Sequence, residues 1–361
     1  MAATCLRWSC ACLLLLGASS GLAWAGSPSS LKRSGEVFQL EAPLVDLYDT
    51  AFVMADPGGG APRVLSPEAL ADLLSRYDVV VFGESHRHSG VHLQQQLLFR
   101  ALVERDGDYI LSLEQFERDV QPVVDDYLAG RVGEMSLISQ GRAWDNYATS
   151  YRPLVEYAGT RQIPVVAAEA PVWAVVCIGQ WGTGILDRFT ARERGWVARD
   201  LNPATGAYRD KYMAFQSTAV AHGGGAATSP EALLKAERSL AGQVARDDTM
   251  AESIILARQA HPGRKVLHLN GNFHSAGFLG IVERLKLRDP GLKIAVIDPL
   301  EVENPLAPTV ASGDLANGTV LQLIYPNPPG FVDGEDTSAW VEGLMSKRKA
   351  SPCKYTPEGA G

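Results

Sequence analysis

The chain has 361 residues, of which 46% are hydrophobic and 20% are charged, and its formal net charge is −8. These values are typical of a folded protein that is long enough for one large α/β domain or for two domains. No basic run with interleaved aromatic residues occurs, so nucleic acid is not an expected partner. Beyond residues 1–25, no segment approaches the roughly 18 consecutive apolar residues that a membrane-spanning helix needs.

Residues 1–25 have the pattern of a secretory signal peptide. Arg7 supplies a positive charge, Leu13–Leu16 form a short apolar core, and Ala23-Trp24-Ala25 fits an A-x-A cleavage site. A lipoprotein attachment cysteine would follow the apolar core, whereas the cysteines of this segment precede it. We therefore expect a cleaved leader, no lipid anchor, and a periplasmic or secreted protein.

The rest of the chain divides by composition into a lead-in, one domain and a tail. Residues 26–65 predict an extended lead-in and residues 327–361 a flexible tail, because both are rich in Gly and Pro. Between them we expect one α/β domain over 66–326, with a mostly helical insert at 171–260. The two cysteines of the mature chain, Cys177 and Cys353, can form one disulfide in an oxidising compartment, but the pairing stays open.

Within this domain, helical and apolar segments alternate in chain order. The first helix is expected to begin after Ser66, a suitable N-cap residue that is followed by Pro67. Further helical stretches lie at 91–104, 117–130 and 149–160, and a long one at 231–259. The apolar runs that predict strands are 79–82, 109–113, 163–168, 265–269, 294–297 and 320–325. The alternation predicts βαβ units around a mostly parallel central sheet.

Acidic residues and histidines follow the first four of these predicted strands. In chain order they are Glu84, His86, Glu114, Glu169 and His274. Because parallel strands end at the same edge of a sheet, where ligands bind in open α/β sheets, we expect these side chains to share one cleft. Three carboxylates and two imidazoles can ligate a divalent metal ion or form a general acid/base set.

Each of these residues also has a structural interpretation. Glu84 and His86 can be a capping carboxylate and a solvated turn, and Glu114 can pair with Arg118. Glu169 can simply precede a turn, and His274 can be an ordinary loop histidine.

Further candidates lie on the predicted helices. His88 and His92 are four residues apart, so they would share a helix face, and this spacing can hold a metal ion. Tyr147 and Tyr151 belong to an aromatic group with Trp144. A tyrosinate is a known ligand of ferric haem, although such residues more often pack a helix.

Several blocks of the sequence resemble the ChaN-like haem-binding uptake family. These blocks are residues 83–86 (Gly-Glu-x-His), 113–122, 127–130, 151–158, 163–168, 243–251 and 271–274. The resemblance covers roughly residues 70 to 300 and implies an α/β fold with helices on both sides of the sheet. It also implies haem at a dimer interface, with a tyrosine as iron ligand and a histidine nearby. The residues that we expect at this cofactor are Tyr147, Tyr151 and His88.

The same family is grouped with Tiki proteases and erythromycin esterases, which share a Gly-x-x-His strand end, paired glutamates and a late histidine. For that branch the resemblance implies hydrolysis, which is metal-dependent in Tiki. Carried over by position, the shared and candidate catalytic residues are Glu84, His86, Glu114 and His274. At residues 168–169 this chain has Ala-Glu where we expect Ala-Asn in many relatives. The extra carboxylate favours a metal or hydrolytic site over an apolar haem slot.

Two hypotheses follow. The first, which we favour, is an exported haem-binding protein that functions in haem or iron uptake, as a homodimer. The second is a hydrolase of small molecules, with His86 or His274 as general base. In it a divalent metal ion would be held by ligands from the set Glu84, His86, Glu114, Glu169 and His274. Membership of a fold family cannot decide between them, since fold does not imply function.

Overall fold

The computed structural model describes residues 34–222, 230–332, 335–339, 343 and 352–357. The leader expected at residues 1–25 lies outside these residues. The described chain divides into two compact units. We call residues 34–170 with 247–335 the sheet unit, and residues 171–246 with 336–357 the helical unit.

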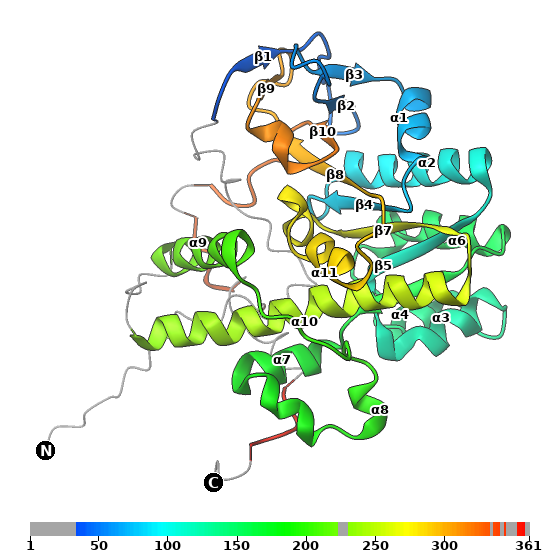
Figure 1. Cartoon of the computed structure of the whole chain (residues 1–361), viewed down its shortest axis with the longest axis vertical. Helices are drawn as coiled ribbons and strands as arrows, with labels where there is room; N and C mark the ends of the chain where they lie inside the picture. Colours follow the sequence, from blue (N-terminus) through cyan, green and yellow to red (C-terminus); the bar gives the residue numbers. More distant parts are fainter. Residues whose placement is uncertain (1–33, 223–229, 333–334, 340–342, 344–351, 358–361) are drawn as a thin grey trace, which may run out of the picture. The chain divides into compact units, whose positions relative to one another are not determined.

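An eight-stranded sheet forms the centre of the sheet unit (Figure 1). Its strands, in spatial order, are β3 (Arg63–Leu65), β2 (Thr50–Met54), β10 (Val320–Ile324), β8 (Ile294–Glu301), β4 (Val79–Glu84), β7 (Lys265–Gly271), β5 (Tyr109–Glu117) and β6 (Val165–Glu169). The strands from β10 to β6 run parallel, whereas β2 and β3 are antiparallel to their neighbours. The expected α/β fold with a mostly parallel sheet is therefore confirmed.

The residues expected to form only an extended lead-in contribute strands. β2 and β3 extend the sheet beside β10, and β1 (Val37–Gln39) pairs with β9 (Thr309–Ala311) in a separate two-stranded sheet. The Gly-rich segment 57–61 is the turn between β2 and β3. Composition pointed to an extended segment here because the Gly, Pro and Ser residues of 26–65 outnumber the residues of β2 and β3 together.

Helices cover both faces of the sheet. One face carries α1 (Pro67–Leu74), α2 (Ser89–Asp106), α3 (Gln121–Leu128), α4 (Glu134–Gln140), α5 (Tyr147–Ser150) and α6 (Arg152–Thr160), and the other carries α11 (Ile281–Arg288) and α10 (Pro230–Ala260) from Asp247 onwards. Alternate side chains of β4 point to the two layers. Val80 and Phe82 pack with the first group, Val79 and Val81 with the second. In the described part of the chain, no helix is long and apolar enough to cross a membrane.

Short segments connect these elements near the ends of the strands. They are the 3₁₀ helices η1 (Arg118–Val120), η3 (Asn272–His274), η4 (Ala276–Phe278) and η5 (Asp314–Asn317). The first helix begins as expected, since the Ser66 side chain accepts a hydrogen bond from the Ala69 amide at 3.2 Å. α2 begins two residues earlier than predicted, at Ser89, because His88 acts as its N-cap.

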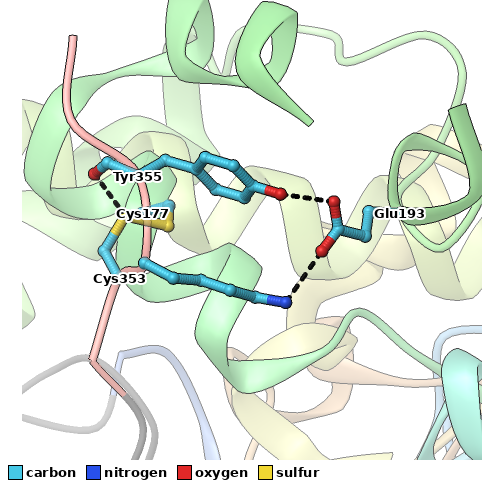
Figure 2. The surroundings of a disulfide bond; sticks show 5 residues. Cys177, Glu193, Cys353 and Tyr355 are labelled. Carbon is cyan, nitrogen blue, oxygen red and sulfur yellow. Dashed lines mark hydrogen bonds and ion pairs between the residues drawn. A yellow bond between two sulfur atoms is a disulfide. The ribbon is translucent and has the colours of Figure 1, made fainter. Parts of the chain in front are cut away.

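The helical unit contains α7 (Val172–Trp181), η2 (Thr183–Arg188), α8 (Ala191–Arg194), α9 (Gly206–His222) and the first part of α10. The unit ends at Arg246 instead of residue 260, because from Met250 onwards α10 packs on the sheet. A disulfide joins Cys177 of α7 to Cys353 (Figure 2). Residues 352–357 are therefore anchored, unlike the flexible tail that we expected.

Candidate functional site

The carboxyl ends of β4, β7 and β5 lie side by side and bring the candidate residues together. Glu84 is paired in register with Gly271, and Leu113 with Leu269. Glu84 and Glu114 therefore flank the end of β7, and η3, which follows directly, carries His274. The carboxyl ends of these parallel strands therefore bring the three side chains to one edge of the sheet, while the cleft that we expected there stays a prediction.

Glu84 is a fully buried carboxylate that several groups hold in its ionised form. Its Oε1 accepts a hydrogen bond from Tyr151 Oη at 2.7 Å and lies 3.0 Å from Nδ1 of His86. Its Oε2 accepts from Gln95 Nε2 at 3.3 Å and lies 3.8 Å from Nδ1 of His92. Burial disfavours the charged form, but the His86 hydrogen bond and the charges of both histidines outweigh it and lower the pKa of Glu84 to about 2.

His86 is the accessible histidine of the site. Its side chain is 38% exposed, and its ring packs edge-on against Trp144 with 5.4 Å between the centroids. Because Glu84 is ionised, Nδ1 of His86 carries the proton that it donates to this carboxylate. A Cβ on Gly271 would come within 2.8 Å of Nε2 of His86, so the approach of this ring requires glycine at the end of β7.

A second chain of polar contacts links Glu114, His274 and Asp247. Glu114 Oε2 accepts a hydrogen bond from the Gly271 amide at 2.6 Å, and its Oε1 lies 3.6 Å from Nε2 of His274. Nδ1 of His274 lies 2.6 Å from Oδ1 of Asp247. The carboxylate–histidine cluster, as we call it, therefore contains Glu84, His86, Glu114, Asp247 and His274.

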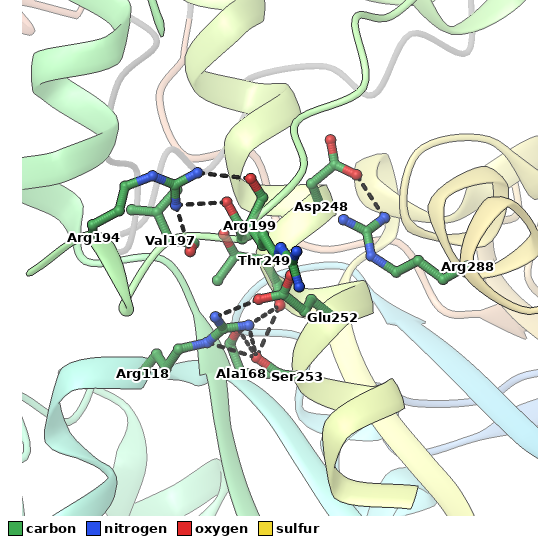
Figure 3. Close-up of polar contacts among 11 residues, drawn as sticks. Arg118, Ala168, Arg194, Val197, Arg199, Asp248, Thr249, Glu252, Ser253 and Arg288 are labelled. Carbon is green, nitrogen blue, oxygen red and sulfur yellow. Dashed lines mark hydrogen bonds and ion pairs between the residues drawn. The ribbon is translucent and has the colours of Figure 1, made fainter. Parts of the chain in front are cut away.

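Asp247 was not among the residues predicted for the site. Two arginines fix α10 beside it (Figure 3). Arg118 donates to the Thr249 carbonyl at 2.8 Å and pairs with Glu252 at 2.9 Å, and Arg288 pairs with Asp248 at 2.7 Å. The signal in the sequence was the family-like block 243–251, which contains Asp247.

The two tyrosines proposed as haem ligands are core residues, which corrects that assignment. Tyr151 is fully buried and donates to Glu84, and burial together with that charge raises its pKa well above the ordinary value. Tyr147 is also buried, packs edge-on against Phe116, and has a raised pKa because of burial. In this conformation both side chains are buried, so neither is exposed for contact with a haem iron.

His88 is likewise a structural residue. Its Nδ1 accepts the Val91 amide at 3.3 Å, so it is Nε2 that donates to the Tyr325 carbonyl at 2.7 Å. Both ring nitrogens are thus engaged, and burial lowers the pKa of the ring. This geometry does not support His88 as a cofactor ligand. It also places His88 in a cap and not on the helix face of His92.

Glu169 lies at the end of the edge strand β6, and its Oε1 accepts the amide of Ala170 at 2.6 Å. Within the described residues, no group of three or more His, Cys, Asp or Glu side chains is arranged to hold a metal ion. The metal set that includes Glu169 therefore stays a prediction without geometric support.

A cavity of about 630 Å³ adjoins the cluster through His92, whose ring forms part of its wall. Its lining consists of Tyr48, Arg87, Ser89, His92, Leu93, Gln96, Asp145, Asn146, Thr149, Ser150 and Pro153. Tyr48 belongs to the segment before β2 and was not predicted for the site, because nothing in the sequence connects it with α2.

Comparison with known proteins places the chain in a family. The family model described as haem-binding uptake, Tiki superfamily, ChaN matches residues 70–285, which is more than half of the chain. This match confirms the resemblance on which the expected site residues were based. A search of curated proteins found no match.

Solved structures support the fold. A ChaN structure from Campylobacter jejuni, described as showing cofacial haem binding, is 16% identical, with a TM-score of 0.54 over 77% of this chain and 98% of that chain. A Bacillus cereus protein is 13% identical, with a TM-score of 0.41 over 72% and 92% of the two chains. The erythromycin esterase EreC is 13% identical, with a TM-score of 0.38 over 66% and 78%. Only the first of these scores is high enough to support a shared fold.

Proposed function

We propose that this protein binds haem and functions in haem or iron uptake, because the chain belongs to the ChaN family of haem-binding uptake proteins in the Tiki superfamily. The family match over residues 70–285 carries this proposal. Tyr48, which lines the cavity, and His86, which follows β4, are the side chains that we propose for the haem, as the next two steps argue.

The first requirement is a side chain that can reach the iron. Tyr48 is 58% exposed and lines the cavity, and it is the only exposed tyrosine among the described residues. A phenolate is an established ligand of ferric haem. We therefore propose Tyr48, in place of Tyr147 and Tyr151, as the iron ligand.

The second requirement is the nearby histidine that the family resemblance implies. His86 is exposed, and its Nδ1–H is held by the ionised Glu84. A carboxylate behind an imidazole fixes its orientation and increases its basicity, as is usual for histidines that bind metals in proteins. Trp144, packed against His86, offers an aromatic surface beside the same ring. These features support His86 as the histidine next to the haem.

The test is a titration of the leaderless protein with hemin, followed by absorbance. We expect a saturable Soret shift with tyrosinate charge-transfer bands. Tyr48→Phe should remove those bands and weaken binding about tenfold or more, which is the loss expected for one strong ligand contact. Tyr77→Phe is the matched control, because Tyr77 precedes β4 and so lies at the opposite end of that strand from Glu84. No saturable shift in the wild-type protein would overturn the proposal.

A second candidate function is hydrolysis by acid/base catalysis. The observation that favours it is the Asp247–His274–Glu114 chain, in which a carboxylate orients a histidine as in enzymes that activate a nucleophile. In this function Glu114→Gln and His86→Ala would abolish turnover of an ester or amide substrate and leave the fold intact. If Glu114→Gln leaves every measured activity unchanged, this candidate loses its main support.

We also propose that the protein is exported. The disulfide between Cys177 and Cys353 is typical of proteins in oxidising compartments, and residues 1–25 have the pattern of a leader. Mass spectrometry of the secreted or periplasmic protein should give a chain that begins at Gly26, without reactive thiols. A chain that retains residues 1–25 would contradict export by cleavage.

Finally, we propose that haem binding joins two copies of the chain, as the family resemblance implies. Light scattering after size-exclusion chromatography, with and without hemin, measures this directly. A mass that stays monomeric in saturating hemin would contradict a haem-bridged dimer.

A further inference from the structure

An arginine occupies a backbone position at the end of α4 that usually holds glycine. α4 ends at Gln140, Gly141 is its C-cap, and Arg142 follows with a φ of 50°. The Ala143 amide donates to the Ile138 carbonyl at 3.1 Å, which is the hydrogen bond of a Schellman motif. In this motif the residue after the C-cap is left-handed and is most often glycine, because a side chain at that φ is costly.

The ion pairs of Arg142 hold it in this unfavourable conformation. Its Nη2 donates to Glu117 Oε2 at 2.5 Å and also to Asp119 Oδ1. The two carboxylate side chains are only 17% and 13% exposed, so water screens them less than it screens an ordinary surface pair. Glu117 is the last residue of β5, and Asp119 belongs to η1. Arg142 therefore ties the end of α4 to the carboxyl end of β5, and these contacts offset the backbone strain.

Trp144 follows directly after this anchored turn. Its carbonyl accepts the Tyr147 amide at 2.8 Å, where α5 begins. Its ring packs edge-on against His86, with 5.4 Å between the centroids, and against Tyr151, with 5.9 Å. The side chains of these two residues are the ones that contact Oε1 of Glu84. The indole therefore touches both partners of that carboxylate oxygen.

The turn and the indole are closely coupled. Only Ala143 separates Arg142 from Trp144, and two residues span at most about 7 Å of chain. Trp144 is only partly buried, so the anchored turn and the ring contacts together decide where the indole lies. Arg142 can thus act on the cluster at Glu84 through the backbone that it anchors.

We propose that Arg142 is a positioning residue: its ion pairs with Glu117 and Asp119 hold Trp144 against His86. In haem binding the indole and the imidazole form one face of the ligand site, and this consequence rests on the proposed function. The contact between the two rings exists without a ligand, so the positioning role has a test of its own.

The variants separate the side chain of Arg142 from its backbone conformation. Arg142→Gly keeps the left-handed turn at a lower cost and removes both ion pairs. Arg131→Gly is the matched control, because Arg131 is an exposed arginine that pairs with Asp126 and not with the end of β5. Circular dichroism melts confirm that both variants are folded.

The readout is the set of ring proton NMR signals of His86, which are assigned by their absence in His86→Ala. The ring current of an indole with its centroid 5.4 Å away shifts these signals, and Trp144→Leu gives their positions without it. We expect Arg142→Gly to move the signals toward the Trp144→Leu positions, and Arg131→Gly to leave them as in wild type. Unchanged signals in Arg142→Gly, or an equal change in Arg131→Gly, would overturn the proposal.

A second variant removes the same ion pairs from the other side. Glu117→Gln combined with Asp119→Asn leaves Arg142 in place without its charged partners, so it should move the His86 signals as Arg142→Gly does. His86 signals that stay as in wild type in this double variant would show that the ion pairs do not hold the indole, and would overturn the proposal.

Titration with hemin tests the consequence for the ligand site. Arg142→Gly and Trp144→Leu should each weaken hemin binding about fivefold, which is the order expected for the loss of one aromatic contact. Equal hemin affinity in wild type and Arg142→Gly would overturn the role of Arg142 in haem binding and leave haem binding itself intact. If wild type does not bind hemin, the proposed function fails, and the His86 signals alone decide whether Arg142 positions Trp144.

Discussion

Asp247 lies 2.6 Å from Nδ1 of His274, and both side chains are buried although 27 residues separate them in the chain. This contact connects the middle of α10 to the segment that follows β7. It also fixes the orientation of the histidine, because Nδ1–H donates a hydrogen bond to Asp247 and Nε2 then faces Glu114, 3.6 Å away. The long helix thus contributes directly to the carboxylate–histidine cluster.

We expect Asp247→Asn to destabilise the sheet unit by roughly 2–4 kcal/mol, because it leaves a buried histidine without its charged partner. Urea unfolding followed by circular dichroism measures the loss. The control is Asp248→Asn, since Asp248 pairs with Arg288 and not with His274. Both variants should lose stability, but only Asp247→Asn should shift the NMR signals of the His274 ring. An unshifted His274 signal in Asp247→Asn would show that the contact does not hold the ring.

The low pKa of Glu84 makes the stability of the folded state depend on pH. A carboxyl group whose pKa falls to about 2 on folding, from an ordinary value near 4.5, stabilises the folded state above pH 4.5. This contribution, on the order of 3 kcal/mol, is lost as the pH falls through about 2. We therefore expect Glu84→Gln to melt well below wild type at pH 7, and the difference to shrink between pH 4.5 and pH 2. A difference that does not change with pH would contradict the ionised form.

Tyr151 should act through Glu84 and not through iron. Tyr151→Phe removes one hydrogen bond to a buried carboxylate, so we expect a loss of roughly 1–3 kcal/mol in stability and a higher pKa for Glu84. Because the pKa of Glu84 rises, the folded state should begin to lose stability at a higher pH than in wild type. The hemin spectrum and affinity should stay unchanged, in contrast to Tyr48→Phe. Loss of the tyrosinate bands in Tyr151→Phe would instead restore Tyr151 as the ligand.

Part of the site could be predicted because its residues follow strands directly. Glu84 and Glu114 end or lie within strands whose apolar runs are unambiguous, and the order of parallel strands brings their ends together. Asp247 could not be predicted in this way. Its place depends on how the part of α10 from Asp247 onwards packs on the sheet. Arginine contacts between residues far apart in the chain fix this part, such as Arg118 with Glu252 (separation 134) and Arg288 with Asp248 (separation 40).

Tyr147 and Tyr151 are a case in which the prediction from the sequence failed. Tyr147 and Tyr151 were expected at a cofactor because aromatic residues cluster around Trp144, but the α5–α6 turn packs both into the core. Exposure of a side chain depends on contacts between elements distant in the sequence, and a single sequence does not record them. Tyr48 was missed for the same reason, since only the folded chain brings the segment before β2 against α2. The Cβ of any side chain at Gly90 would meet the Leu47 carbonyl at 2.3 Å, which shows how closely they pack.

The disulfide should decide the behaviour of the carboxyl-terminal segment. Cys353 is joined to Cys177, and its neighbours Lys354 and Tyr355 both hydrogen-bond to Glu193 (Figure 2). The Tyr355 ring also packs against Phe189, with 5.2 Å between the centroids. Two kinds of contact therefore hold the segment on the helical unit, and the covalent one constrains the unfolded chain as well.

We expect Cys353→Ser to lower the stability of the helical unit by roughly 2–4 kcal/mol and to make the bond after Lys354 accessible to trypsin. Limited proteolysis followed by mass spectrometry detects this cleavage, and wild type treated with a reductant should behave like the variant. Glu193→Gln is the matched control, because it weakens the polar contacts and leaves the disulfide in place. It should expose the segment less than Cys353→Ser does. If both variants are cleaved at the same rate, the polar contacts and not the disulfide anchor the segment.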